Sequence, residues 1–223
     1  MLAIDTATPA ITAGIVFLDT GAPRTLAQRV TVNARAHGEL LTPQVQQVLA
    51  EADVPLSGLD AIVCGAGPGP FTGLRVGMVT AAAFGDALGI PVHPVCSLDG
   101  IATDVAGTEP FAVVTDARRR EVYWAGYDPT GERLDGPGVA APAEILDRLT
   151  QLGVRALAGE GATRYADVLG LPVVEPAYPS SRGLVTAAAN ALRTGAAPAP
   201  LTPLYLRRPD AVETVARKQV SRL

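Results

Sequence analysis

Apolar and polar positions follow each other in blocks along the chain, and the period of the pattern changes from strand-like to helix-like. Residues 37–53 carry apolar side chains every three to four positions, which predicts an amphipathic helix. Short apolar or alternating runs predict strands. The other elements predicted for the first half are strands at 2–5, 10–20, 24–33, 59–64 and 90–97, and helices at 72–89 and 97–105.

The same order restarts after residue 110. The elements predicted here are strands at 111–117, 121–128, 133–140 and 171–176, a strand and loop at 154–162, and helices at 142–153, 163–170 and 180–195. The order β-β-β-α-β-α is thus repeated roughly twice, although the two halves are not alike in sequence. We therefore expect an α/β protein of two lobes with mixed sheets, 1–107 and 108–200. The tail, 201–223, is expected to pack back on the first lobe and then to be disordered.

Composition restricts the function classes. The chain has 223 residues, of which 48% are hydrophobic and 18% charged, so it can bury a sizeable core. Its net charge of −4 gives no general attraction to nucleic acid, and any RNA contact would be local or made through a partner. The N-terminus lacks a signal-peptide pattern, and the longest apolar run is too short for a bilayer. These features predict a soluble, cytoplasmic protein without membrane contact.

The most distinctive stretch is "GAGPGPFTGLRVG", residues 65–77, between a predicted strand and a predicted helix. It has no lysine, so it is not a Walker A loop. Pro70 and Thr72 occupy the sixth position in the two possible registers of the dinucleotide fingerprint, where glycine is needed. It also has no serine for a nucleophile elbow. The plain interpretation is a glycine-rich turn that enters a buried helix.

Arg75 lies in the first turn of that helix. The helix dipole disfavours a cation there by roughly 0.3 to 1 kcal/mol. A compensating partner is therefore expected. We favour a salt bridge to a carboxylate such as Asp5, and a bound anion is the alternative.

The same helix carries a stripe of small residues. They recur at every fourth position, on one helical face: Gly73, Gly77, Ala81, Gly85 and Gly89. Glycine inside a helix costs about 0.8 to 1 kcal/mol relative to alanine, so close packing should offset that cost. The stripe could pack on the chain's own sheet, on helix 37–53, or on another protein.

Five motifs together resemble one family. "LAIDTAT", "AHGELLTP", "GPGPFTGLRVG", "DARRREVYWAGY" and "PLYLRRP" match the motifs of the TsaB family in order and spacing, along nearly the whole chain. One position departs from it, because the family usually has serine where this chain has Pro70. A role for a hydroxyl at that position is therefore in doubt.

The resemblance implies a two-lobed actin/Hsp70-like (RNase H-like) fold and a non-catalytic accessory role. In that family the paralogous partner TsaD transfers a threonylcarbamoyl group to N6 of the adenosine next to the tRNA anticodon, and the ATPase TsaE acts on the complex. Contact with tRNA would be indirect, and a homodimer could form without TsaD. Because TsaB meets TsaD through first-lobe helices, the resemblance favours the partner interpretation of the stripe. The predicted partner interface is Gly73, Gly77, Met78, Ala81 and Gly85.

No catalytic or metal site of the chain's own is predicted. TsaD holds a metal with two histidines one helical turn apart and an aspartate, whereas this chain has only His37 and His93, far apart in sequence. No cofactor is expected in the isolated chain, and ATP or ADP binding within the complex is left open. The alternative function is a stand-alone ATP-dependent small-molecule kinase of the actin-like superfamily.

In actin-like folds the phosphates lie between the lobes, against the turn after the first strand and a matching turn in the second lobe. The corresponding stretches here are "DTAT" (residues 5–8) and "TDAR" (residues 115–118). The residues that are either a vestigial phosphate turn or structural are Asp5, Thr6, Thr8, Thr72 and Arg75. The run Arg118 to Arg120 could touch tRNA phosphate, although a short arginine run is more often solvated.

Overall fold

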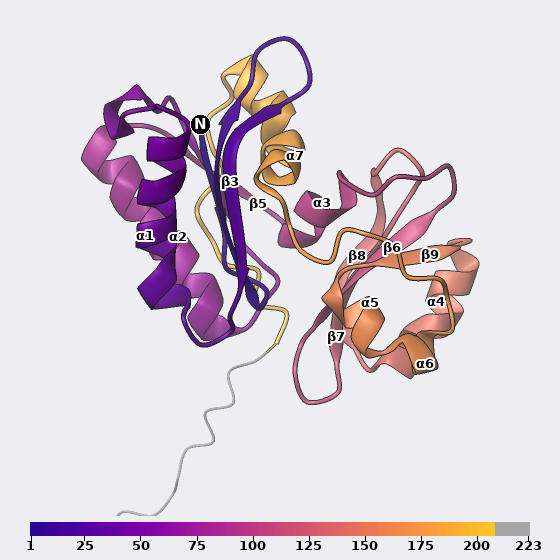
Figure 1. The fold of residues 1–223 in the computed structure, drawn as a ribbon. Helices are drawn as coiled ribbons and strands as arrows, with labels where there is room; N and C mark the ends of the chain where they lie inside the picture. The colour runs from indigo at the N-terminus through magenta and orange to yellow at the C-terminus, as the bar shows by residue number, and fades with distance from the viewer. Residues whose placement is uncertain (208–223) are drawn as a thin grey trace, which may run out of the picture.

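A computed structural model describes residues 1–207 and shows two lobes, each built on one mixed sheet (Figure 1). The first sheet has the order β3-β2-β1-β4-β5. Its strands are β1 Leu2–Asp5, β2 Ala10–Phe17, β3 Arg24–Val32, β4 Ile62–Gly65 and β5 Val92–Val95. β1, β2 and β3 pair antiparallel, and β4 and β5 continue the sheet parallel to β1. β1 is central and buried along its whole length, as its apolar sequence predicts.

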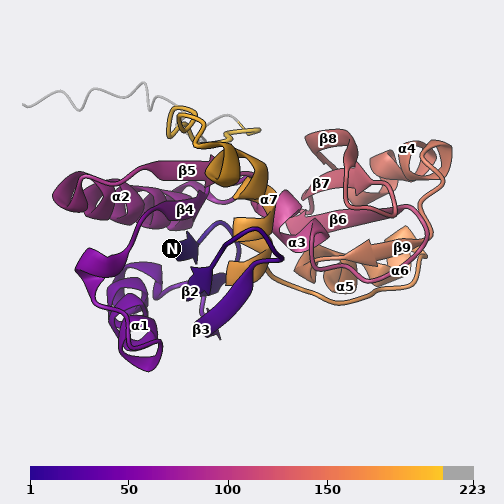
Figure 2. The same cartoon turned by 90° about the horizontal axis from the view of Figure 1, so that it is seen from above.

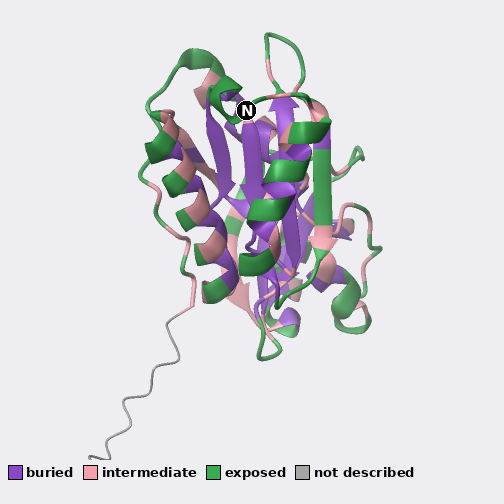
Figure 3. Cartoon of the chain, turned by 60° about the vertical axis from the view of Figure 1, so that its left-hand side comes forward, coloured by how far each residue is buried: buried purple, intermediate pink, exposed green. Residues whose placement is uncertain are grey.

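Two long helices cover the outer face of the first sheet, α1 (His37–Glu51) and α2 (Phe71–Leu88). A short 3-10 turn, Leu56–Gly58, leads from α1 to β4. The apolar stripe of α1 packs with Leu74 and Met78 of α2 on alternate side chains of the strands. The outward faces of these helices are exposed, while the strands behind them are buried (Figure 3).

The second sheet has the order β8-β7-β6-β9. Its strands are β6 Phe111–Asp116, β7 Val122–Tyr127, β8 Arg133–Ala140 and β9 Ala156–Ala158. Its outer face packs on a chain of short helices: the 3-10 helix Pro142–Ile145, α4 Leu146–Gln151, α5 Glu160–Arg164 and α6 Ala166–Leu169. The two mixed sheets agree with the predicted two-lobed α/β fold.

Two helices are exchanged between the lobes, and here the structure differs from the expected division at residue 107. α3 (Ser97–Ala102) follows the last strand of the first sheet, but its apolar residues join the core of the second sheet. α7 (Ser181–Thr194) comes from the second half of the chain and packs on the first sheet. The two helices lie against each other between the lobes (Figure 2). Sequence order alone does not reveal which sheet a helix covers.

α7 begins and ends where its sequence predicts. The Ser180 hydroxyl accepts a hydrogen bond from the Gly183 N–H at 2.8 Å, which satisfies a donor of the first turn. Gly195 ends the helix in the left-handed conformation, with φ of 63°.

Two other predicted elements are wrong. The strand predicted at 171–176 is reduced to a single bridge between Leu157 and Val173. It contains Pro172 and Pro176, which have no N–H to donate to a ladder. The helix predicted at 163–170 is instead two short helices, because Tyr165 between α5 and α6 leaves the helical conformation.

The segment before residue 208 crosses from one lobe to the other. Leu201 packs on the first core, and the Leu204 N–H donates to the Ala66 carbonyl at 2.8 Å. Arg207 reaches the second lobe, where it pairs with Glu121 at 3.0 Å and donates to the Ala117 carbonyl. The expected return to the first lobe is therefore seen, together with a second contact. The expected disorder of the tail's end falls on residues 208–223, outside the described residues.

Candidate functional site: the cleft between the lobes

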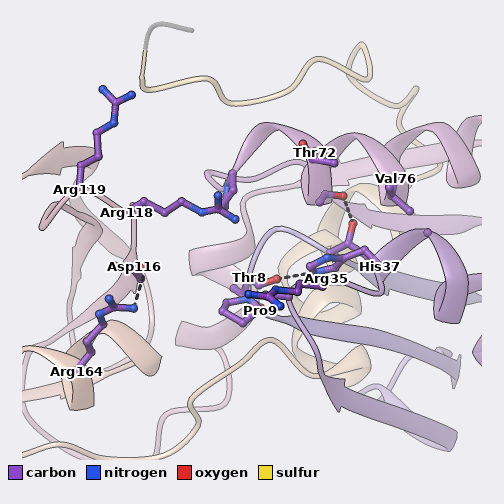
Figure 4. A pocket seen from close by; sticks show the side chains of 15 residues that line it. Thr8, Pro9, Arg35, His37, Thr72, Val76, Asp116, Arg118, Arg119 and Arg164 are labelled. Carbon is purple, nitrogen blue, oxygen red and sulfur yellow. Dashed lines mark hydrogen bonds and ion pairs between the residues drawn. The ribbon is translucent and has the colours of Figure 1, made fainter. Parts of the chain in front are cut away.

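A cleft of about 420 Å³ lies between the lobes, and both lobes line it (Figure 4). The first lobe contributes the turn after β1 and the N-terminal ends of α1 and α2. The second lobe contributes the turn after β6 and the end of α5. The polar and charged lining residues include Thr6, Thr8, Arg35, His37, Thr72, Asp116, Arg118 and Arg164. The two predicted phosphate turns therefore face the same cleft.

Asp5, at the end of β1, does not face this cleft. Its carboxylate is fully buried, accepts a hydrogen bond from the Ser97 hydroxyl, and accepts another from the Ala7 N–H at 2.8 Å. Burial raises the pKa of Asp5 to about 6, whereas the two hydrogen bonds and the nearby His37 lower it. The carboxylate thus joins β1 to the start of α3.

The two threonines of the β1 turn are also engaged. The Thr6 hydroxyl donates to the Gly73 carbonyl at 2.7 Å and accepts from the Gly77 N–H at 2.9 Å, so it is tied to α2. The Thr8 hydroxyl accepts from the Ala10 N–H at 3.2 Å. His37 Nε2 lies 2.9 Å from the Thr8 carbonyl and must carry the proton, because a carbonyl only accepts. That contact fixes the start of α1.

The glycine-rich stretch 65–77 folds closely over the β1 turn. A side chain at Gly69 would collide with the backbone of Ala7, and a β-carbon at Gly73 would lie 2.7 Å from the Thr6 carbonyl oxygen. These glycines are therefore needed where two backbones approach closely. The stretch lets α2 begin against β1.

The small-residue stripe of α2 faces inward, so the predicted partner interface is wrong for these residues. All five residues of the predicted interface are buried: Gly73, Gly77, Met78, Ala81 and Gly85. A β-carbon at Gly77 would lie 2.5 Å from the Thr6 Oγ1, and one at Gly85 would collide with Val92. The stripe packs on the chain's own sheet, one of the alternatives that the sequence leaves open.

Arg75 makes no salt bridge to Asp5, so this prediction is also wrong. Its Nε donates to the Tyr205 hydroxyl at 2.7 Å, and its guanidinium lies 5.8 Å and 5.6 Å from the ring centres of Phe71 and Tyr205. The two rings are 4.6 Å apart. Arg75 thus holds the C-terminal segment on α2. Of the predicted phosphate-turn residues, Thr6, Thr8 and Thr72 line the cleft, whereas Asp5 and Arg75 do not.

The turn after β6 carries three consecutive arginines in the left-handed conformation, with φ of 61°, 52° and 63° for Arg118, Arg119 and Arg120. Arg118 and Arg119 line the cleft, and Arg120 does not. Arg118 extends from the second lobe toward the first, as Figure 4 shows. The arginine run is evident from the sequence, but the sequence does not indicate that Arg118 and Arg119 face the cleft while Arg120 does not.

Beside this turn, Asp116 is held by the second lobe. It pairs with Arg164 at 3.3 Å and accepts from the Tyr165 hydroxyl at 3.1 Å. Its N–H donates to Glu160 at 3.0 Å. Burial raises the pKa of Glu160 to about 7; the Asp116 N–H opposes this rise, and the Asp116 carboxylate adds to it. Sequence reasoning missed Glu160, Arg164 and Arg35, which are isolated charges without a motif.

Comparisons with known proteins show the family of this chain. The family model described as TsaD, tRNA N6-adenosine threonylcarbamoyltransferase, matches residues 26–218. The tRNA threonylcarbamoyladenosine biosynthesis protein TsaB of Escherichia coli K12 is 30% identical over 161 residues, which cover 68% of this chain and 67% of that protein. The chain belongs to the TsaB family.

Two further matches extend over most of the chain. YeaZ from Pseudomonas aeruginosa superposes with a TM-score of 0.74 at 29% identity and covers 92% of this chain and 98% of its own. An uncharacterized protein of Mycobacterium leprae is 54% identical over 211 residues, or 95% of this chain, and this chain spans 55% of its length. The actin-like, RNase H-like fold is thus that of the TsaB family.

Pro70, where the TsaB family usually has serine, is the N-cap residue of α2. The helix starts without a side-chain cap, since proline has no hydroxyl to accept from the first turn. Pro70 therefore cannot cap the helix through a side-chain hydroxyl.

Titratable groups elsewhere are dispersed. Within residues 1–207, no three His, Cys, Asp or Glu side chains gather in a group that could hold a metal ion. Cys64 and Cys96 are buried free thiols, and burial raises the pKa of both, that of Cys96 to about 12. Burial lowers the pKa of His93.

No helix in the described part of the chain is long and apolar enough to cross a bilayer.

Proposed function

We propose that the chain is an accessory subunit in tRNA threonylcarbamoyladenosine biosynthesis, which pairs with TsaD and does not itself transfer the group. Membership of the TsaB family supports the pathway, since the Escherichia coli relative is named for it. TsaE and tRNA would then meet the chain within the complex. A homodimer in the absence of TsaD belongs to the same proposal.

One observation carries the accessory role. The polar side chains of the β1 turn bind other parts of the chain: Asp5 binds Ser97 and the Ala7 N–H, and Thr6 binds both ends of a turn of α2. A fully buried carboxylate that is already hydrogen-bonded on both oxygens and does not line the cleft is a poor ligand or base for a substrate there. The turn that would meet phosphates in an active relative serves here to hold α2 and α3.

Because its small-residue stripe is buried, α2 offers a partner only its outer face, which we define as Arg75, Val79, Ala82, Ala83 and Asp86. Val79 is 67% exposed, the highest value among the large apolar side chains of residues 1–207. An exposed apolar side chain flanked by one basic and one acidic residue resembles the centre and rim of a protein interface. We place TsaD on this face.

The pairing is tested with Val79→Glu. Its matched control is Val168→Glu, which changes a 47% exposed valine on α6 in the second lobe. Burying a new charge in the interface should weaken binding to purified TsaD by at least about tenfold, roughly 1.4 kcal/mol. The control should bind as the wild type does, measured by titration calorimetry. Equal binding by both variants would place TsaD elsewhere.

The accessory role is tested by reconstitution with TsaD, TsaE, threonylcarbamoyl-adenylate, ATP and tRNA. Omitting the chain should abolish modification, and the chain without TsaD should give none. Asp5→Asn should leave the reconstituted rate nearly unchanged. A large loss of rate with intact pairing would mean that Asp5 takes part in the chemistry. ATP-dependent phosphorylation of a small molecule by the chain alone would favour the alternative kinase.

A further inference from the structure

A second pocket, of about 690 Å³, lies in the first lobe at the opposite end of β1 from the cleft. Met1, directly before β1, lines this pocket, whereas the turn after β1 lines the cleft. The other walls come from the turn between β2 and β3, the residues before β4, the start of β5 and the end of α7. In Figure 1 the N-terminus and the last turn of α7 lie at this end of the first lobe. The pocket therefore shares no lining residue with the cleft.

Much of the wall is apolar and continues the core between the first sheet and α7. Met1, Leu18 and Leu192 pack at the margin of that core, and all three line the pocket. α7 ends at Thr194, so it leaves this end of the core uncovered. An apolar pocket with a few polar groups is the usual form of a small-molecule site, and its volume lies in the usual range for one.

His93, on the edge strand β5, is the buried polar side chain of this pocket. It is only 6% exposed, and within residues 1–207 its ring nitrogens have no hydrogen-bond partner. A buried polar group without a partner costs roughly 1 to 3 kcal/mol. Burial lowers the pKa of His93, so near pH 7 the ring is neutral and offers one donor and one acceptor. A ligand that hydrogen-bonds to the ring would remove the cost.

The charged groups that line the pocket offset one another. Arg193 donates to the Asp19 carbonyl at 3.2 Å and to the Gly21 carbonyl, at the end of α7 where the helix dipole favours a cation. The Asp19 carboxylate accepts from the Gly21 N–H at 2.7 Å. Burial lowers the pKa of the Met1 amino group, and the nearby Asp60 carboxylate opposes this change. A charged ligand would lose water here without an excess of opposite charge to replace it.

We propose that this pocket binds a small uncharged molecule whose apolar body packs on Leu18 and Leu192 and whose hydroxyl or similar polar group hydrogen-bonds to His93. The apolar walls, the balanced charges and the unpartnered neutral imidazole all favour that class of ligand. The proposal goes beyond the pairing with TsaD and does not depend on it, because every lining residue belongs to this chain.

The first test compares probes that share one apolar body. Para-cresol is uncharged with a hydroxyl, toluene lacks the hydroxyl, para-toluate is an anion and para-methylbenzylammonium is a cation. Each is titrated into the full chain and followed by amide chemical shifts in nuclear magnetic resonance. Para-cresol should shift the signals of Ala61 and Leu192 and bind at least about threefold more tightly than either charged probe, since a charge costs more to desolvate.

The second test changes the pocket. His93→Phe keeps a ring but removes the nitrogens, and should weaken para-cresol about fivefold, as expected for one hydrogen bond, while toluene binds as before. Ala196→Phe places a ring in the pocket and should abolish binding of both. Ala199→Phe is the matched control, because Ala199 is an equally exposed alanine of the same segment that does not line the pocket. It should bind both probes as the wild type does.

Circular dichroism must show that each variant is folded. No binding of para-cresol by the wild type, or equal binding by Ala196→Phe and Ala199→Phe, would overturn the site. Tighter binding of para-toluate or para-methylbenzylammonium would overturn the uncharged class of ligand, and an unchanged para-cresol affinity in folded His93→Phe would overturn the hydrogen bond. If His93→Phe does not fold, weaker binding of toluene than of para-cresol by the wild type supports the hydrogen bond, and equal binding overturns it.

Discussion

The buried Asp5 carboxylate accepts the hydroxyl hydrogen of Ser97, and this contact links the central strand β1 to α3, which packs on the other lobe. The carboxylate has no exposed surface. Burial is the largest influence on its pKa, which lies at about 6 in the fold, well above its ordinary 3.8. The buried Asp5 therefore affects the stability of the fold.

A defined pH dependence follows for Asp5. Because its pKa is higher in the folded state, the folded protein binds more protons than the unfolded chain between pH 4 and 6. The stability that Asp5 contributes is present at low pH, is lost as the pH rises through this window, and is constant above it. A pKa rise from 3.8 to about 6 corresponds to about 3 kcal/mol.

Asp5→Asn keeps acceptor and donor groups for Ala7 and Ser97 and removes the charge. The difference in free energy of unfolding between Asp5→Asn and the wild type should grow in favour of the variant from pH 4 to 6, measured by urea unfolding. Asp5→Ala removes the same charge and should follow the same pH trend, but it should be less stable than Asp5→Asn by roughly 1 to 3 kcal/mol at every pH, since two buried groups lose their partner. A pH-independent difference for Asp5→Asn would contradict the raised pKa.

Glycine-to-alanine substitution should have opposite effects on stability at Gly77, buried in α2, and at Gly38, exposed in α1. Gly77→Ala would bring a β-carbon within 2.5 Å of Thr6 Oγ1 and disturb its two hydrogen bonds. Overpacking costs roughly 1 to 3 kcal/mol, only partly offset by about 1 kcal/mol of helix propensity. Gly38→Ala in α1 meets nothing within 4 Å and should stabilise by up to about 1 kcal/mol. Thermal melting of both variants measures these changes in stability. A higher melting temperature for Gly77→Ala would show that the stripe is not tightly packed.

Tyr205 should control how firmly the C-terminal segment is held. Tyr205→Phe removes the acceptor of Arg75 but keeps the ring on Phe71, and should cost about 0.5 to 1 kcal/mol. Tyr205→Ala also loses the ring contact, worth about 0.5 to 1.5 kcal/mol more. Hydrogen exchange at the Leu204 N–H, which bonds to Ala66, should accelerate in that order. Arg75→Ala combined with Tyr205→Phe should be less than additive; full additivity would mean that the two do not interact.

Local signals in the sequence predict well where the elements lie. The serine cap and glycine end place α7, and the apolar periodicity places α1 at residues 37–51 within two residues of its predicted end. Sequence does not show which side of a helix is buried when several sides are apolar. α2 carries small residues on one face and larger apolar residues on others, and the fold buries the small face against β1.

The cleft could be predicted only in part. The two turns after β1 and β6 follow from the motifs, and both line it. Arg35 and Arg164 have no local pattern, because their meeting depends on how two lobes are set side by side. The partner of Arg75 is 130 residues away, in the C-terminal segment. Contacts between charged side chains and partners so far apart in the sequence leave no local pattern from which they could be predicted.

The exchange of α3 and α7 has a consequence for synthesis of the protein on the ribosome. When residues 1–100 have emerged, α1 and α2 can cover one face of the first sheet, but the other face, with Ala3, Val16 and Val63, stays open to water. Its cover, residues 181–194, is made near the end of translation. The first lobe therefore completes its core only after the second has been synthesised. A ribosome that stalls at mid-chain holds a first sheet with one apolar face covered by helices and the other exposed to water.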